Sequence, residues 1–228
     1  MPIQAVVFDA YGTLFDVAGA ARAAAAEPGG ERLAAIWPRL AEDWRRKQLE
    51  YTWLRAITRI HADFAKVTAD GLDWAMEAAG LVDPALRARL LALYDALPAY
   101  SEVPAVLAAL KGHGLATAIL SNGAPAMLGA AVRSAGIGAH LDAVLSVEEV
   151  GVFKPDARVY SLATARFGLR PEQVLFVSSN GWDVAGASGY GFATVWVNRA
   201  GLPQDRLSHG PAHVMPDLSA IPDLARAL

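Results

Sequence analysis

The fold is decided by the stretch Val6-Val7-Phe8-Asp9-Ala10-Tyr11-Gly12-Thr13-Leu14. The apolar run from Ile3 to Phe8 ends in a single carboxylate, Asp9, and a glycine-containing loop with the hydroxyl of Thr13 follows. Continuous apolar, β-branched runs are typical of buried parallel strands. Open α/β sheets bind ligands at the carboxyl ends of their strands, so this position makes Asp9 a candidate nucleophile.

Composition excludes several classes of protein. The 228 residues can form one large domain, or a core with a smaller domain inserted into it. The net charge of −3 without a basic stripe argues against nucleic acid as a partner. No apolar run is long enough to cross a bilayer, and no signal-peptide pattern is found. The chain has no cysteine, hence no disulfide or thiol nucleophile. A soluble cytoplasmic protein is expected.

From about Gly112 onward, apolar strands and helical stretches alternate. Strands are predicted at residues 115–120, 143–147, 174–177 and 193–197, the last being the final strand, and helices at residues 124–135, 155–167 and 183–189. Such alternation predicts a parallel sheet with right-handed crossovers. Residues 202–216, rich in Pro and His, are predicted to form a surface connection before a short final helix.

Before this alternation lies a long segment without a strand pattern. Residues 17–30 are alanine-rich and close on Glu27-Pro28-Gly29-Gly30, which predicts one short helix and a break. Residues 31–97 have a helical pattern with breaks near Thr68, Gly80 and Pro84, and it ends at Pro98.

The predicted fold class is therefore α/β, a doubly wound parallel sheet with an inserted all-helical cap. The Rossmann-like core comprises residues 1–16 and 99–228, and the cap comprises residues 17–98. A cap in this place lies over the strand ends, where it can exclude water from a site.

Four segments place polar residues just after predicted strands. They are Asp9 with Tyr11 and Thr13, Ser121-Asn122-Gly123, Phe153-Lys154-Pro155, and Ser178-Ser179-Asn180-Gly181-Trp182-Asp183. Taken alone, each segment fits ordinary turn chemistry, a solvated lysine or a helix cap. Because the carboxyl ends of parallel strands lie along one edge of a sheet, all four are expected to meet at one site.

On these residues the chain resembles the L-2-haloacid dehalogenases of the haloacid dehalogenase superfamily. The superfamily motifs correspond to Asp9 with Thr13, Ser121, Lys154 and Asp183. More specific similarities lie in residues 8–17, 47–55, 120–123 and 176–183, and the resemblance extends from about Ile3 to beyond Asn198.

Tyr11 distinguishes dehalogenation from phosphate transfer. Phosphatases of this superfamily use a second Asp two residues after the nucleophile to protonate the leaving alcohol, and Mg²⁺ to neutralise the phosphoryl oxygens. Here Tyr11 takes the place of the second Asp, and Ser178-Ser179-Asn180 stands where the metal-binding acids are expected. A halide leaves as a stable anion without a proton, and a monocarboxylate needs less charge neutralisation than a phosphate. The interpretation is therefore a dehalogenase; the alternatives are a small-molecule phosphatase of the same superfamily and a catalytically silent binding relative.

The resemblance implies a two-step mechanism. Asp9 attacks C2 of the 2-haloacid and forms an ester, and water activated by Asp183, with Ser178 and Asn180, hydrolyses it to a 2-hydroxy acid of inverted configuration. Lys154 is expected to keep Asp9 ionised or to hold the substrate carboxylate. Further assignments are Ser121 to the substrate carboxylate, and Thr13 and Tyr160 to the supporting polar network.

A halide site is expected at Arg45, with Asn122, Trp182 and Tyr11 nearby. Arg45, Leu49 and Trp53 share one face of a predicted helix. The alternative is that residues 44–47, Arg45 and Arg46 among them, form a solvated basic face. The apolar wall around the substrate is assigned to Leu49, Phe64 and Trp182, with packing within the cap as the alternative for Phe64.

The expected substrates are short L-2-haloalkanoic acids, including haloacetates such as fluoroacetate. No cofactor and no metal are expected, and the partners are the 2-haloacid substrate and the halide, with no nucleic acid and no membrane. A homodimer is expected by resemblance.

Overall fold

The computed structural model describes residues 1–27 and 31–228. Within them the chain forms a six-stranded parallel sheet with the strand order β3-β2-β1-β4-β5-β6. The strands are β1 (Ala5–Phe8), β2 (Ala116–Ser121), β3 (Ala143–Ser146), β4 (Val174–Ser178), β5 (Ala193–Val197) and β6 (His213–Met215). The predicted α/β class with a doubly wound parallel sheet is confirmed.

Strand β1 lies in the middle of the sheet, and all four of its residues are buried. Helices cover both faces of the sheet, which explains why the strand is apolar without alternation. Phe8 at its end is in register with Ile119 of β2 and Val177 of β4. The Asp9 backbone N–H donates to the Val177 carbonyl at 2.9 Å. The β1–β4 ladder thus continues up to Asp9 and fixes it at the carboxyl edge.

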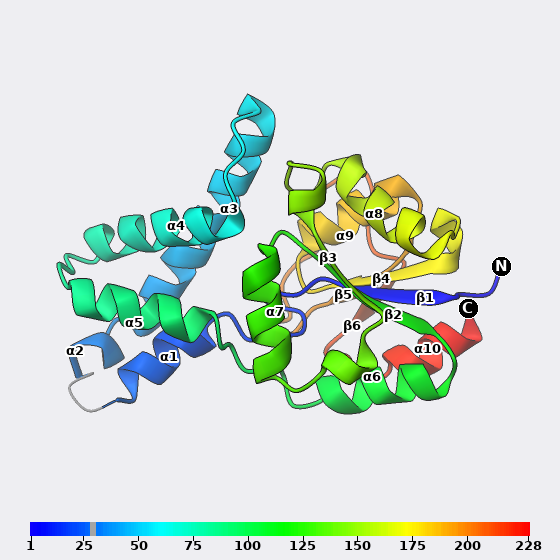
Figure 1. The fold of residues 1–228 in the computed structure, drawn as a ribbon, viewed down its shortest axis with the longest axis horizontal. Helices are drawn as coiled ribbons and strands as arrows, with labels where there is room; N and C mark the ends of the chain where they lie inside the picture. Colours follow the sequence, from blue (N-terminus) through cyan, green and yellow to red (C-terminus); the bar gives the residue numbers. More distant parts are fainter. Residues whose placement is uncertain (28–30) are drawn as a thin grey trace.

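Helices of the core pack on the two faces of the sheet (Figure 1). Helices α8 (Ala157–Phe167) and α9 (Gly181–Tyr190) lie together on one face, and α6 (Val103–Gly112) and α10 (Ile221–Ala227) on the other. Helix α7 (Pro125–Ser134) packs beside β3. Helix α9 begins two residues earlier than predicted, so Asp183 lies inside its first turn and Asn180 takes the N-cap position.

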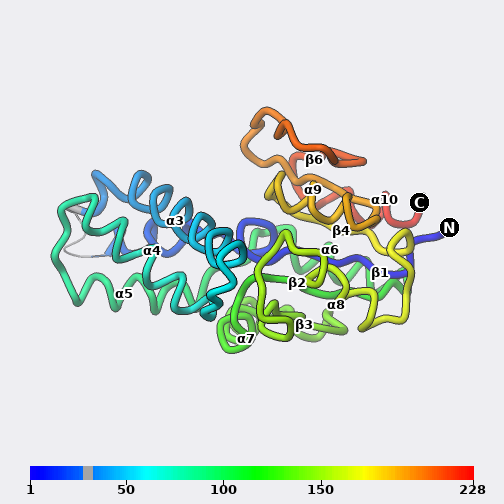
Figure 2. The backbone as a smooth tube through the Cα atoms, turned by 90° about the horizontal axis from the view of Figure 1, so that it is seen from above, coloured from blue at the N-terminus to red at the C-terminus, as the bar shows by residue number. Residues whose placement is uncertain are grey.

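The remaining helices stand together to one side of the sheet (Figures 1 and 2). They are α1 (Gly19–Ala25), α2 (Glu31–Ala34), α3 (Trp37–Thr58), α4 (Phe64–Ala78) and α5 (Pro84–Tyr94). Where the chain leaves and re-enters the core, the Asp16 N–H donates to the Pro98 carbonyl at 3.0 Å. This contact supports the boundaries proposed for the cap, residues 17–98, which stay a prediction.

The predicted helix break near Thr68 is wrong, because α4 continues through this residue. The interruption occurs earlier, where Arg59 adopts a left-handed conformation at the end of α3 and Asp63 caps α4 through the Lys66 N–H at 2.8 Å. Thr68 is accommodated because its hydroxyl accepts a hydrogen bond from the Gln48 amide at 2.8 Å. A β-branched residue with such a partner does not end a helix.

The prediction that residues 193–197 form the last strand is also wrong. Strand β6 follows within the segment read as a surface connection and pairs with β5 through Val195 and His213. Only three residues long and flanked by prolines, it offers too short a pattern to be recognised. The predicted break at residues 27–30 falls largely on 28–30, outside the described residues. Among the described residues, no helix is long and apolar enough to cross a membrane.

Candidate active site

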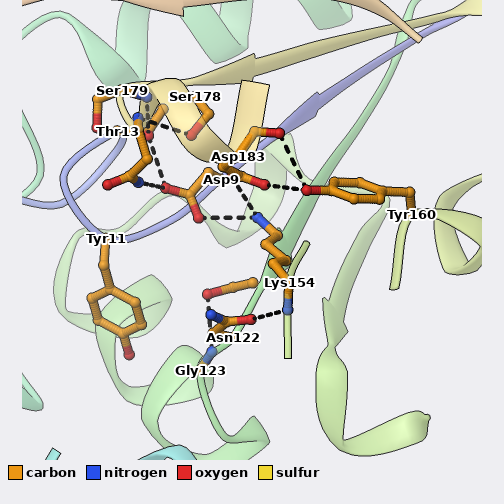
Figure 3. Close-up of polar contacts among 12 residues, drawn as sticks. Asp9, Tyr11, Thr13, Asn122, Gly123, Lys154, Tyr160, Ser178, Ser179 and Asp183 are labelled. Atoms are coloured by element: carbon orange, nitrogen blue, oxygen red, sulfur yellow. Dashed lines mark hydrogen bonds and ion pairs between the residues drawn. The ribbon is translucent and has the colours of Figure 1, made fainter. Parts of the chain in front are cut away.

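Donors from three separate loops hold the Asp9 carboxylate (Figure 3). The Thr13 hydroxyl and the Asn180 side-chain amide each donate to Oδ2 at 3.0 Å, and the Lys154 ammonium donates to Oδ1 at 3.1 Å. Asp9 is only 6% exposed. Charge-assisted hydrogen bonds from three directions leave a buried carboxylate with one fixed orientation.

Lys154 bridges two buried carboxylates. Its Nζ lies 3.1 Å from Asp9 Oδ1 and 2.9 Å from Asp183 Oδ2, and the side chain is 1% exposed. Burial by itself lowers the pKa of Lys154, but the Asp183 and Asp9 carboxylates outweigh burial and raise that pKa above its ordinary value. Lys154 is therefore an ammonium ion at neutral pH, and its single charge is shared between the two acids.

Asp183 receives a second donor from the opposite side, the Tyr160 hydroxyl, at 2.9 Å from Oδ1. Both side chains are completely buried. Burial raises the pKa of Asp183 above its ordinary value; the Lys154 ammonium lowers that pKa, while the Asp9 carboxylate adds to the rise. The Asp183 carboxylate is thus basic for an aspartate, which suits a group that takes a proton from water.

The loop after β4 is tied to the loop after β1. The Ser179 N–H donates to the Thr13 hydroxyl oxygen at 2.8 Å, and the Asn180 N–H donates to the Ser178 hydroxyl at 3.1 Å. Gly12 has a φ of +89°, and a Cβ there would lie 3.0 Å from the Ser179 hydroxyl. Glycine is required both by this left-handed conformation and by the close approach of the loops.

Ser121 and Asn122 organise the loop after β2. The Ser121 hydroxyl accepts the Gly123 N–H at 3.0 Å, and Asn122 Oδ1 accepts the Lys154 backbone N–H at 3.0 Å. Such side-chain contacts to backbone N–H groups are typical of turns, as the alternative interpretation has it. The Asn122 contact also fixes the backbone position of Lys154. The assignments of Ser121 to a substrate carboxylate and of Asn122 to a halide stay predictions.

The Tyr11 side chain points away from Asp9 (Figure 3). Its ring stacks on Phe64 and Tyr94, with centroids 5.5 Å and 5.4 Å away. Burial raises the pKa of the Tyr11 hydroxyl well above its ordinary value. The position two residues after Asp9 therefore holds a neutral phenol directed into the helical segment, and it cannot act as the acid that a phosphatase uses.

Arg45 extends from α3 to the core loops. Its guanidinium donates to the Tyr11 carbonyl at 3.3 Å and to Asn180 Oδ1 at 3.4 Å. Arg46 turns elsewhere: it binds the Asp43 carboxylate at 2.8 Å and lies over the Trp74 ring. The solvated-surface alternative therefore describes Arg46 and not Arg45.

Further along the same face of α3, Trp53 contacts Trp182 of the core edge to face, with ring centroids 5.4 Å apart. Both rings line a cavity of about 530 Å³ together with Phe153. Asp9 is not among the residues that line this cavity. Phe64 is completely buried between Tyr11 and Phe153. Both partners belong to the predicted core, so Phe64 lies where the cap contacts the core. Its two alternative roles and the substrate-wall roles of Leu49 and Trp182 stay predictions.

With this geometry in place, comparisons with known proteins become informative. A family model described as a haloacid dehalogenase-like hydrolase matches residues 3–191. The chain belongs to this hydrolase family. It is 44% identical to (S)-2-haloacid dehalogenase 1 of Pseudomonas sp. (strain CBS-3), over 98% of this chain and 96% of the relative. It is 46% identical to the (S)-2-haloacid dehalogenase of Xanthobacter autotrophicus, over 90% of this chain and 78% of that relative.

A solved structure in the same family shares the fold. It is the L-2-haloacid dehalogenase from Xanthobacter autotrophicus with chloropropionic acid covalently bound, and its TM-score is 0.88. Sequence identity is 38%, with 99% of each chain covered. This haloacid dehalogenase-like hydrolase thus shares its fold with a protein whose structure holds chloropropionic acid covalently bound.

Most candidate residues of this hydrolase meet around Asp9. Those in the hydrogen-bonded cluster or linked to it are Asp9, Thr13, Arg45, Asn122, Lys154, Tyr160, Ser178, Asn180 and Asp183. Sequence reasoning missed Gln48 and Tyr94, which contact Arg45 and Tyr11 respectively, and it gave no hydrogen-bonding role to Ser179, whose N–H binds Thr13. Gln48 stands three residues after Arg45 on a helix, and that spacing was the available signal.

Proposed function

We propose that the protein is an (S)-2-haloacid dehalogenase that hydrolyses short L-2-haloalkanoic acids to 2-hydroxy acids with inversion. The observation that supports this most is the buried Asp9–Lys154–Asp183 cluster beside a Tyr11 that faces away. A fixed nucleophile and a basic carboxylate share one cation, and the residue two positions after the nucleophile is not placed to protonate a leaving group.

In the first step, an Asp9 carboxylate oxygen attacks C2 from the side opposite the halogen. The new C–O bond forms as the carbon–halogen bond breaks, and the halide leaves with the bonding electrons. We assign the halide to Arg45, a cation in a partly buried position. The Ser121 hydroxyl and the backbone N–H groups near it are assigned to the substrate carboxylate.

In the second step, water attacks the Asp9 carbonyl carbon of the ester and passes a proton to Asp183. The bond between that carbon and the substrate oxygen breaks, and Asp183 returns its proton to that oxygen as the 2-hydroxy acid leaves. The second proton of the water passes to solvent as the Asp9 carboxylate re-forms. Lys154 and Tyr160 occupy one lone pair on each Asp183 oxygen. A carboxylate has about four acceptor sites, so Asp183 can still accept a hydrogen bond from water.

The reaction is proposed to need no metal. Mg²⁺ sites are built from carboxylates and other oxygens, and in this cluster the Lys154 ammonium already lies between the two carboxylates. Ser178 and Ser179 also contribute neutral hydroxyl groups at the loop where a phosphatase carries acids. The Lys154 ammonium therefore takes the place between the two carboxylates that a metal cation would occupy.

The test is an incubation with racemic 2-chloropropionate in the presence of EDTA. We expect release of chloride, consumption of the L enantiomer alone, and formation of D-lactate. Absence of chloride together with Mg²⁺-dependent cleavage of a phosphate ester would establish the phosphatase alternative instead. Haloacetates, including fluoroacetate, enter the same assay as further substrates, and fluoride release would extend the range to the strongest carbon–halogen bond.

The pH dependence of ester hydrolysis is expected to follow Asp183, because only its carboxylate can accept a proton from water. Its raised pKa places the acid limb of the rate above the ordinary aspartate value of about 3.9. The Tyr160 hydrogen bond lowers the pKa of Asp183, so Tyr160→Phe is expected to move this limb to higher pH. Loss of the bond should also reduce the free energy of unfolding by about 1.5 kcal/mol.

The measurement is the single-turnover rate of ester hydrolysis against pH in both proteins. Tyr190→Phe is the matched control, since Tyr190 packs beside Tyr160 but its hydroxyl contacts Thr164. An acid limb that stays in place in Tyr160→Phe would refute Asp183 as the group that takes the proton.

A homodimer and a cytoplasmic location complete the proposal. Exposed apolar side chains near the end of α3, those of Leu54, Ile57 and Ile60, support an association surface. The absence of cysteine is compatible with a reducing compartment. Light scattering on the purified protein tests the dimer directly, and a monomeric mass would refute it.

A further inference from the structure

Arg45 is held entirely by neutral oxygen atoms. Its guanidinium donates to Gln48 Oε1 at 2.7 Å, to the Tyr11 carbonyl at 3.3 Å and to Asn180 Oδ1 at 3.4 Å. Across residues 1–27 and 31–228, no carboxylate lies within ion-pair distance of it. The adjacent Arg46 is paired with Asp43 at 2.8 Å. The charge of Arg45 is thus positioned but not compensated.

Gln48 makes the shortest of these contacts, and its own amide is fully used. Oε1 accepts from Arg45, with the Tyr94 hydroxyl 3.2 Å away, while Nε2 donates to the Thr68 hydroxyl at 2.8 Å and to the Tyr94 hydroxyl at 3.1 Å. Gln48 is completely buried. With Thr68 on α4 and Tyr94 on α5, one amide locks three helices together and presents a single oxygen to the guanidinium.

The packing of α3 against α4 makes this arrangement possible. Gly71 of α4 faces Gln48 so closely that a Cβ would lie 3.1 Å from the Gln48 backbone nitrogen and 3.3 Å from the Trp44 carbonyl. A Cβ at position 71 would force the two helix backbones slightly apart, so glycine favours this close approach, which brings Thr68 within reach of the Gln48 amide. The close approach of the α3 and α4 backbones at Gly71 therefore helps to fix the orientation of the Gln48 side chain.

We propose that Gln48 is a positioning residue for Arg45: it directs the guanidinium toward the core and, being neutral, leaves its charge free for the departing halide. The inference rests on the proposed function, which assigns the halide to Arg45. A glutamate at this position would hold the guanidinium as well but would neutralise it. The departing halide would then face an ion pair without net charge, and its electrostatic attraction to Arg45 would be weaker.

The experiment separates the two chemical steps. Single-turnover halide release from L-2-bromopropionate and hydrolysis of the ester are timed in the wild type, Gln48→Met and Gln48→Glu, and inhibition by bromide is measured for each. Loss of a hydrogen bond to a charged group predicts at least about tenfold slower halide release in Gln48→Met. Gln48→Glu should weaken bromide inhibition by at least about tenfold, and ester hydrolysis should keep its rate in both variants.

A milder pair of variants covers the case that Gln48 variants do not fold. Thr68→Val removes the acceptor of the Gln48 amide and should slow halide release about threefold. Thr52→Val is the matched control: Thr52 is a buried threonine on α3, the helix of Gln48, but its hydroxyl donates to the Leu49 carbonyl, at 2.6 Å. It should leave halide release and bromide inhibition unchanged.

The possible outcomes are distinct. Slower halide release with unchanged ester hydrolysis supports the positioning role. An equal slowing of both steps, or unchanged halide release and bromide inhibition in folded Gln48→Met, overturns it while the proposed function stands. A wild-type protein that releases no halide overturns the proposed function and this inference together.

Discussion

Replacing Asp9 by Asn is expected to abolish turnover of L-2-chloropropionate, with a loss of at least about 10⁴-fold. The amide oxygen of Asn is a poor nucleophile, so the ester cannot form. The fold should be kept, because Asn has the same shape and Lys154 still has the Asp183 carboxylate at 2.9 Å. The measurement is initial-rate chloride release, with circular dichroism to verify folding.

Asp16→Asn serves as the control for this variant. Asp16 lies in the same loop and is partly buried, but it contacts Arg22 and the Ala18 N–H instead of the cluster. Its replacement should leave the rate unchanged. Residual turnover near the wild-type rate in Asp9→Asn would remove Asp9 from the mechanism.

An isotope experiment on the wild type examines the same residue without mutation. In a single turnover in ¹⁸O-labelled water, attack on the ester carbonyl leaves the label in the Asp9 carboxylate and none in the product. Label in the 2-hydroxy acid would instead mean that water attacks C2 directly, which needs no covalent intermediate. Mass spectrometry of the peptide that contains Asp9 distinguishes the two.

The sheet and its edge could be predicted because their signals are local. The strand leading to Asp9 is a continuous apolar run, and the Gly, Ser and Asn residues that follow other strands mark loops. Parallel strands then place Asp9, Ser178 and Asp183 at one edge by topology alone. Strand β6 lacks such a signal, since it is three residues long and is defined only by pairing with β5.

Contacts between the helices and the core were less predictable. Helix periodicity placed Arg45 and Trp53 on one face, and both do contact core residues, Asn180 and Trp182. The buried partner of Arg45, Gln48, depends on how closely α4 approaches α3, which a glycine at position 71 decides. Tyr94 joins through packing across a large sequence separation, and no local pattern reports such a contact.

Replacing Lys154 by Met is expected to lower turnover at least about 10³-fold and to reduce the free energy of unfolding by about 3–5 kcal/mol. The variant leaves the Asp9 and Asp183 carboxylates buried without their shared cation. Denaturant unfolding at neutral pH and initial rates measure the two effects. Lys111→Met is the control, because Lys111 pairs with Asp142 at the surface, where an ion pair contributes less than about 1 kcal/mol.

The difference in stability between wild type and Lys154→Met should depend on pH in a defined way. The raised pKa of Lys154 means that its contribution is fully present below the ordinary lysine value of about 10.4 and is lost as the pH rises through the higher folded-state value. At acid pH a second effect enters. Loss of the ammonium in the variant raises the pKa of Asp183 further, so Asp183 is protonated as the pH falls and the destabilisation of the variant decreases. The difference should therefore be largest near neutral pH and shrink toward both extremes. A difference that is small at pH 7, or that grows as the pH rises beyond the lysine range, would show that Lys154 does not compensate the two carboxylates.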